Sequence, residues 1–120
     1  MEKKNKREIG GRFEETACRY LTENGLKILK RNFCIRQGEI DIVAKDGNTL
    51  VFVEVKYRKD TSAGLPQEAV TLKKQKQISR VAVFYLSFSG LSLDTPCRFD
   101  VVAICGEKTD WIKNAFCYVE

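Results

Sequence analysis

The chain has 120 residues, 43% of them hydrophobic, and its 21 lysines and arginines against 16 acidic residues give a net charge of +5. This length and apolar content are typical of one domain around a single core, so we expect residues 1–120 to form one domain, with residues 1–8 as a flexible basic arm. The chain has no histidine, which excludes hydrolases that use a histidine base and serine or cysteine nucleophiles activated by histidine.

The chain is predicted to begin with a helix over residues 9–24, which ends at Gly25. The apolar residues of this helix recur at helical spacing: Phe13, Ala17, Tyr20 and Leu21. Glu14 borders this apolar stripe, and a surface carboxylate is the ordinary interpretation of such a residue. Residues 26–35 alternate well enough between apolar and polar side chains to predict a first strand.

A hairpin follows, predicted from two alternating apolar segments, 38–44 and 50–56, with a turn at Asp46-Gly47. Glycine supplies the positive φ that tight hairpin turns require. Pairing Ala44 with Thr49 sorts the side chains onto two faces, because successive side chains of a strand point to opposite sides. One face is wholly apolar and is expected to be buried: Ile40, Ile42, Ala44, Val51, Val53 and Val55. The other face carries three carboxylates and one lysine, with two apolar residues among them: Glu39, Asp41, Val43, Phe52, Glu54 and Lys56.

Asp41 and Glu54 lie diagonally across the hairpin in this register, roughly 7–8 Å apart at the backbone. Both carboxylates can reach one ion at that separation, and such oxygen ligands suit Mg²⁺ or Mn²⁺. Lys56 points the same way, to hold a water or to stabilise phosphate charge. A charged sheet face turned to water is the alternative, since antiparallel sheets commonly expose one. The addition of Asp41 at the matching register favours a site.

A second helix is predicted from Pro66, because proline suits the first helical position and Glu68 is favourable in the first turn. Its buried stripe is predicted to be Ala69, Leu72, Ile78, Val81, Ala82, Tyr85 and Leu86. At 100° per residue, three cations share the side nearer solvent. They are Lys73, Lys76 and Arg80. Lys74 is expected to lie nearer the sheet.

The last main strand is predicted over residues 98–105, and residues 111–119 are expected to return as an edge strand or extended segment. Asp100 interrupts the apolar strand, and we expect it to bind a neighbouring arginine or to cap a turn rather than to act in catalysis. Trp111 and Phe116 are expected to be packing residues rather than platforms for bases.

Five cysteines are scattered along the chain without a Cys-x-x-Cys pair, and we expect buried thiols in a reducing compartment. They are Cys18, Cys34, Cys97, Cys105 and Cys117. A zinc site is not expected without histidine or paired cysteine. The longest apolar stretch, 81–86, is far shorter than the ~20 residues that span a membrane, and the charged segment 1–7 does not lead into a signal peptide. The expected location is cytoplasmic, with no membrane partner.

Asp41, followed on the next strand by Glu54-Val55-Lys56, resembles the PD-(D/E)XK signature of restriction-endonuclease-like nucleases. Further motifs, spread over nearly the whole chain, resemble the YraN-like family of small bacterial proteins. They are Gly11-Arg12, Glu14, Ala17, Tyr20-Leu21, Gly25, Arg31-Asn32, Gly38-Glu39-Ile40-Asp41, Val51-Phe52-Val53-Glu54-Val55-Lys56, Arg58, Pro66, Glu68-Ala69-Val70, Lys74, Arg98-Phe99-Asp100-Val101-Val102 and Asn114-Ala115-Phe116. Phe13 departs from this pattern, because the family usually has glycine there.

The elements predicted along the chain follow the order αβββαβ. The resemblance implies an α/β domain of restriction-endonuclease-like type, with a central mixed β-sheet flanked by helices. It implies Asp41, Glu54 and Lys56 as catalytic residues. Asp41 and Glu54 would bind Mg²⁺ or Mn²⁺, helped by Glu14 or Glu39. The residues implied in phosphate or nucleic-acid contact are Arg58, Gln67 and Lys74. An ordinary first-turn residue at Gln67 and a solvated lysine at Lys74 are the alternatives.

The function indicated is metal-dependent hydrolysis of nucleic-acid phosphodiester bonds. A basic surface beside an acidic pocket serves such an enzyme, because cations hold the backbone while the metal acts at the cut. DNA as the substrate, including branched or repair structures, and a homodimer follow from the resemblance, which extends to archaeal Holliday-junction resolvases. Two alternatives stand beside this function: a nucleic-acid-binding module of the same fold that does not cut, and a structural or protein-interaction domain.

Overall fold

The structure, a computed structural model, describes the backbone of residues 6–58 and 70–120 and, within those ranges, the side chains from residue 11 onward. The elements are α1 (Lys6–Glu23), β1 (Lys27–Ile35), β2 (Gly38–Asp46), β3 (Thr49–Arg58), α2 (Leu72–Phe88), β4 (Cys97–Cys105) and β5 (Lys108–Phe116). The predicted order is confirmed, and β5 is the expected C-terminal edge strand. Because α1 begins at Lys6, residues 6–8 of the expected arm are helical; residues 1–5 lie outside the described ranges.

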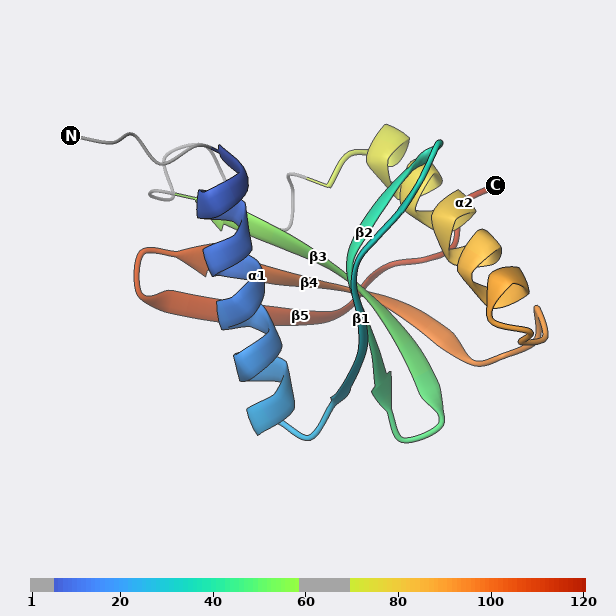
Figure 1. Ribbon diagram of the computed structural model, residues 1–120, viewed down its shortest axis with the longest axis horizontal. Coiled ribbons are helices and arrows are strands. Elements are labelled where there is room, and N and C mark those ends of the chain that lie inside the picture. The colour runs from blue at the N-terminus through green and yellow to red at the C-terminus, as the bar shows by residue number, and fades with distance from the viewer. Residues whose placement is uncertain (1–5, 59–69) are drawn as a thin grey trace.

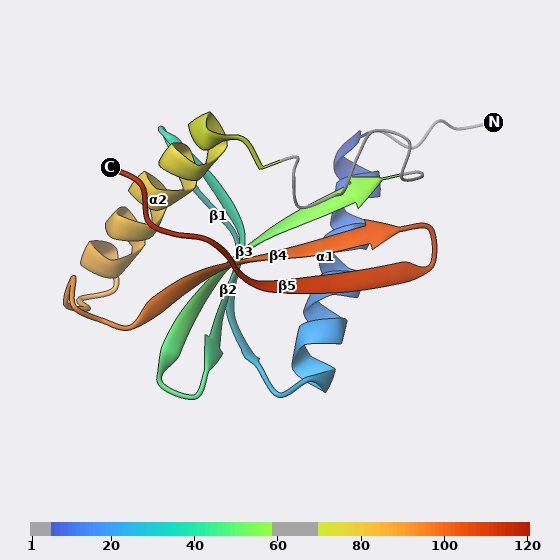
Figure 2. The same ribbon diagram turned by 180° about the vertical axis from the view of Figure 1, so that it is seen from behind.

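The strands form one mixed sheet in the order β1-β2-β3-β4-β5. β3 and β4 are parallel, and the other neighbours are antiparallel. A parallel pair needs a crossover connection, and the segment that contains α2 makes it. Figures 1 and 2 show α1 and α2 on opposite sides of a strongly twisted sheet. No helix among the described residues is both long and apolar enough to cross a membrane.

Each face of the sheet is buried in its own hydrophobic cluster. The cluster beneath α2 includes Phe33, Ile40, Val43, Phe52, Ile78, Val81, Leu86, Phe99 and Val101. The cluster beneath α1 includes Ala17, Leu21, Ile42, Ala44, Val51, Val53, Val102 and Ile104. Val43 and Phe52, which share the predicted polar face of the hairpin, are almost completely buried. A hairpin face turned to water is therefore wrong for these two positions, because α2 covers them.

The register of the hairpin differs by two residues from the expected one. Ala44 pairs with Val51, and Asp46 pairs with Thr49, so the turn consists of Gly47-Asn48, with Gly47 at a φ of 60°. A shift by two residues keeps side chains on the predicted face, because the side-chain period of a strand is two. One step beyond the last pair, Ile42 and Val53, the register brings Asp41 level with Glu54 rather than diagonal to it.

The alternation of β2 is interrupted at Asp41. Ile40 packs in the cluster beneath α2, whereas Ile42 packs beneath α1, so the prediction that both share one face is wrong. Asn32 on β1 lies between the pairs that these two isoleucines make, and its φ of 53° is in the left-handed region. Such a residue turns a strand locally. Figure 1 shows β1 and β2 bending away from β3 together.

Helix α2 begins at Leu72 rather than at Pro66. Thr71 is its N-cap, with extended backbone and a hydroxyl that accepts the N–H of Lys74 at 3.2 Å. One continuous helix from Pro66 is therefore wrong, because Val70 and Thr71 are not helical and a threonine cap satisfies the first helical N–H groups. Leu72, in the first turn, is exposed instead of buried. Pro66, with the neighbouring Gln67, Glu68 and Ala69, lies outside the described residues.

The expectation of buried thiols is confirmed only for Cys18. All five cysteines are free, and Cys34, Cys97 and Cys117 are exposed. Cys34 lies on the edge strand β1 and Cys97 opens β4, where strand ends and edges leave side chains uncovered. These two strands are separated by β2 and β3 in the sheet.

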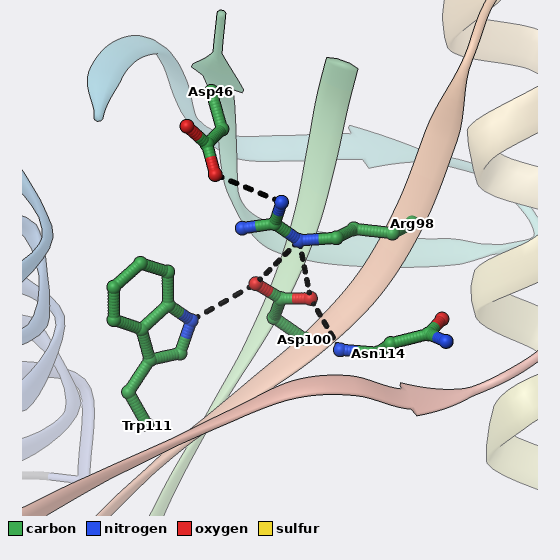
Figure 3. A network of polar contacts seen from close by, with 5 residues as sticks. All are labelled: Asp46, Arg98, Asp100, Trp111 and Asn114. Atoms are coloured by element: carbon green, nitrogen blue, oxygen red, sulfur yellow. Dashed lines mark hydrogen bonds and ion pairs between the residues drawn. The ribbon is translucent and has the colours of Figure 1, made fainter. Parts of the chain in front are cut away.

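A buried carboxylate joins the two C-terminal strands (Figure 3). Asp100 on β4 is fully buried and accepts hydrogen bonds from Arg98 Nε at 3.1 Å, Trp111 Nε1 at 2.9 Å and the backbone N–H of Asn114 at 2.9 Å. The guanidinium of Arg98 also donates to Asp46 at 2.8 Å, at the end of β2. The expected arginine partner of Asp100 is confirmed. Asp100 ties β4 to β5, and Arg98 ties β4 to the hairpin turn through Asp46.

Asp100→Asn should lower the free energy of unfolding by about 3–5 kcal/mol, as the loss of one partner of a buried ion pair does. The amide removes the charge opposite Arg98 and puts an NH2 group in place of one accepting oxygen, so that the N–H of either Trp111 or Asn114 faces another donor. Urea denaturation measures the loss. Asp110→Asn, at a half-exposed position of β5, is the control and should change stability by less than about 0.5 kcal/mol. Equal losses in both variants would contradict a stabilising role for the network.

Candidate metal and nucleic-acid site

The site begins where β2 separates from β3. Backbone pairing of the two strands ends at Ile42 and Val53, and the next donor along β3, the N–H of Val55, is taken by a side chain. Asp41 Oδ2 accepts this N–H at 2.8 Å. The carboxylate therefore replaces a strand partner and is held in the opening between the two strands.

Three carboxylates from two elements converge at this opening. Glu14 of α1 and Glu39 and Asp41 of β2 each offer an oxygen, and the three oxygens lie within 4.8 Å of one another. All three residues are partly buried. The N-terminal helix thus places Glu14 against the sheet and partly buries it. The ordinary interpretation, by contrast, is a carboxylate on the surface.

Glu14, Asp41 and Glu54 line one pocket of about 230 Å³ between α1 and the sheet. Phe13 and Tyr57 form another part of its wall, and their rings stack with centroids 3.9 Å apart and planes 14° from parallel. Phe13, the position that departs from the family pattern, therefore packs against β3 beside the carboxylates. Sequence reasoning misses Tyr57, for which alternation along β3 is the only signal.

Glu54 is neutralised from the other side. It is only 6% exposed, and its Oε1 lies 3.6 Å from Lys56 Nζ and 3.8 Å from Lys74 Nζ. Burial raises the pKa of Glu54, while the charges of Lys74 and Lys56 act in the opposite direction. Lys74 is predicted as a phosphate contact near the sheet; the structure places it near the sheet, with its ammonium on Glu54.

Asp41 has no such cation among its described contacts. Burial, and after it the charge of Glu54, raise the pKa of Asp41 from 3.8 to about 8, against the hydrogen bond from Val55 N–H. Glu14 and Glu39 raise this pKa further. Around neutral pH, therefore, no described cation balances the carboxylates at the opening. Either a proton on Asp41 or a bound cation would relieve their mutual repulsion.

The donor set fits a small divalent cation. Mg²⁺ keeps oxygen ligands at about 2.0–2.1 Å, which puts opposite ligands about 4.2 Å apart, and the oxygens of Glu14, Glu39 and Asp41 lie within 4.8 Å of one another. Carboxylate oxygens are what Mg²⁺ and Mn²⁺ prefer. Glu54 lies outside this trio, so its predicted place as a ligand stays a prediction.

Two further residues are predicted as phosphate contacts. Arg58 is the last residue of β3, half-buried and paired with Cys105 of β4, and Gln67 lies outside the described residues. On α2 the predicted division of cations is confirmed. Lys74 is half-buried, whereas the three cations of the opposite side are exposed. These are Lys73, Lys76 and Arg80.

Comparison with known proteins agrees with the family that the motifs indicate. Residues 13–104 match the model of a family described as uncharacterised protein family UPF0102. A UPF0102 protein from Lachnoclostridium phytofermentans is 50% identical over 112 residues, which cover 93% of this chain and 95% of the relative. One from Aliivibrio salmonicida is 48% identical over 119 residues (96% and 97%), and one from Francisella tularensis is 44% identical over 110 residues (91% and 94%).

Without divalent metal, the wild type should lose more thermal stability than Asp41→Asn as the pH rises from about 5 to about 9. The pKa of Asp41 is higher in the folded chain, at about 8, than its ordinary 3.8. Its contribution to stability is therefore complete below about pH 4 and is lost as the pH rises through 8. The melting temperature in EDTA, followed by circular dichroism, measures this. Asp110→Asn should follow the wild type, and parallel curves for Asp41→Asn would contradict the raised pKa.

Proposed function

The chain belongs to the uncharacterised protein family UPF0102, and we propose that it is a metal-dependent endonuclease that hydrolyses nucleic-acid phosphodiester bonds, with DNA as the substrate. The observation that carries this proposal is the convergence of Glu14, Glu39 and Asp41 beside Glu54, with two lysines on the far side of Glu54. Acidic and basic groups thus meet in one place, drawn from α1, β2, β3 and α2.

Asp41, Glu39 and Glu14 would hold the ion, with Glu54 as a further carboxylate of the same pocket. When bound, Mg²⁺ or Mn²⁺ polarises a phosphate oxygen and lowers the pKa of a bound water. The hydrogen bond from Val55 N–H fixes the Asp41 carboxylate, so its free oxygen is oriented before any ligand arrives. Such preorganisation is what an ion-binding carboxylate needs.

Lys56 and Lys74 supply the positive charge. Each ammonium has three N–H donors, so contact with Glu54 leaves donors for a phosphate oxygen or a water. Both side chains are about one third exposed or slightly less, so a ligand in the pocket can reach them. Lys56 is held in position by strand β3. We assign it the role of positioning the attacking water or of stabilising the charge that develops on the phosphate.

The order of these residues along the sheet supports the same proposal. Asp41 lies one residue outside the paired part of β2, and Glu54, the first residue of Glu54-Val55-Lys56, lies level with it on β3, as the PD-(D/E)XK signature of restriction-endonuclease-like nucleases requires. The first turn of α2 contains Lys74, which contacts Glu54, and the exposed cations of the same helix offer contacts to a phosphate backbone.

A binding module that does not cut is the second candidate, and one observation favours it. Glu54 is already balanced by Lys56 and Lys74, so this part of the site needs no ion to be stable. Both candidates bind nucleic acid, and the response to metal separates them.

Mn²⁺ should raise the melting temperature of the wild type and should support cleavage of DNA that EDTA abolishes. An ion at 100 times its dissociation constant adds about 2.7 kcal/mol of stability. Asp41→Asn should lose both the thermal shift and the cleavage, while Asp110→Asn should keep them. The substrates are branched, flapped, single-stranded and duplex DNA. DNA binding in EDTA with neither a metal shift nor cleavage of any substrate would favour the binding module, and an equal metal shift in Asp41→Asn would place the ion elsewhere.

Lys56→Ala should slow single-turnover cleavage by about 10²-fold or more, as the loss of one preorganised donor does. DNA affinity should fall by less than about threefold, because one lysine is a small part of the attraction between a basic protein and DNA. Lys45→Ala is the matched control, since Lys45 is exposed near the turn of the same hairpin, away from the pocket. A rate for Lys56→Ala equal to that of the Lys45 variant would rule out the assigned role.

A further inference from the structure

We propose that a single-stranded segment of DNA binds along the exposed face of α2, with unpaired bases stacked on Phe84 and Phe88 in the groove between α2 and β1. The choice of DNA as the nucleic acid rests on the proposed function. The groove, its exposed rings and its positive charge are observed independently of that function, and they lie outside the acidic pocket.

The groove has a volume of about 670 Å³ and lies between the C-terminal half of α2 and the edge strand β1. Phe84 is 48% exposed and Phe88 is 72% exposed, although large aromatic side chains usually contribute to a core. Both rings rest on the buried ring of Phe33, with centroids 6.3 and 5.9 Å away, and their planes are within 15° of parallel to each other. They therefore form a supported aromatic surface that is open to a ligand.

A row of cations leads to this surface. One side of α2 carries a line of exposed side chains, because its members recur at intervals of three or four residues. The line consists of the cation row, Lys73, Lys76 and Arg80, followed by Phe84 and Phe88. At a rise of 1.5 Å per residue, the whole line is roughly 22 Å long. It starts next to Lys74, which contacts Glu54, and thus connects the acidic pocket with the groove.

The charge of the two elements selects a polyanion. α2 contains four lysines and arginines, β1 contains three, and neither element contains an acidic residue. Lys30 of β1 lines the groove itself. A second copy of this chain on the same face would bring like charges together, whereas phosphate groups are complementary to them.

The aromatic rings select unpaired bases among polyanions. A groove of cations with exposed aromatic side chains is the arrangement by which proteins bind single strands, because every base has a face that can stack. In a duplex each base is already stacked on its neighbours and paired. Rings on the protein surface therefore add affinity for a single strand, whereas the cations attract both forms.

The test measures binding in EDTA, where no cleavage occurs, with labelled oligo(dT) and a blunt duplex of the same length. Phe84→Ala/Phe88→Ala should lower the affinity for the single strand by about tenfold or more and that for the duplex by less than about twofold. Leu93→Ala is the control, because Leu93 is 70% exposed and lies outside the groove. An equal loss on both DNAs, or no loss on either, would overturn the proposal.

Phe88→Trp tests the stack without removing the ring. It should keep the affinity for oligo(dT) within about twofold, and its added fluorescence should be quenched by the single strand and not by the duplex. Unquenched fluorescence at saturation would overturn base stacking. So would sedimentation of the wild type as a dimer that Phe84→Ala/Phe88→Ala dissociates, since the face would then join two copies. Tighter binding of the matching RNA would overturn the choice of DNA.

The cation row has its own readout. Simultaneous substitution of all three cations by glutamine should reduce the slope of log affinity against log salt. The reduction should be about 0.7 for each phosphate of a single strand that is no longer neutralised. The three are Lys73, Lys76 and Arg80. The aromatic double variant should leave that slope unchanged, and an unchanged slope in the triple variant would take the row out of the binding path. Because all these measurements omit metal, they can fail while cleavage succeeds, and the reverse.

Discussion

The hydrogen bond from Val55 N–H to Asp41 is the constraint on which the rest of the site depends. Two paired strands ordinarily satisfy each other's backbone groups, and a buried donor left without a partner costs free energy. Here the part of β2 that precedes Ile42 turns away from β3 together with β1, and a carboxylate takes over the partner role for β3. The sheet can therefore open without leaving this N–H unpaired, and the opening is where Glu14 and Glu39 reach Asp41.

This arrangement gathers several carboxylates at a partly buried opening, where their negative charge is poorly solvated. Burial raises the pKa of both Asp41 and Glu54, but among the described residues the contacting cations, Lys56 and Lys74, are both on Glu54. A fold selected only for stability gains nothing from the uncompensated carboxylate, since burying a charge without a partner is costly. A site that receives a cation gains from it, because the attraction is already in place.

The sequence reveals the parts of this arrangement that follow from side-chain period and misses those that follow from strand geometry. The prediction that Asp41 and Glu54 lie together, which is met because both line one pocket, survives an error of two residues in register because parity assigns the face. The bend at Asn32, which sends Ile40 to the opposite cluster, has no periodic signal. Pro66 and the N-cap Thr71 both favour a helix start, and only the described backbone decides between them. The exposed cysteines escape prediction because a residue's preference for burial does not show which positions lie at sheet edges.

Helix α2 extends from the acidic pocket to the aromatic groove. Its position depends on a close contact with the turn between β1 and β2. The side chain of Gln77 donates to the carbonyl of Gln37 at 2.8 Å and packs onto Gly38, where any Cβ would lie 2.6 Å from Gln77 Cγ. Only glycine at position 38 admits this approach without displacing Gln77. The same contact holds the helix against the β1–β2 turn near its start, and the Lys74–Glu54 pair holds it against β3. With its first turns attached at two points, α2 directs its exposed cations along a fixed line from the pocket to Phe84 and Phe88, so the distance between the two sites is set by the fold.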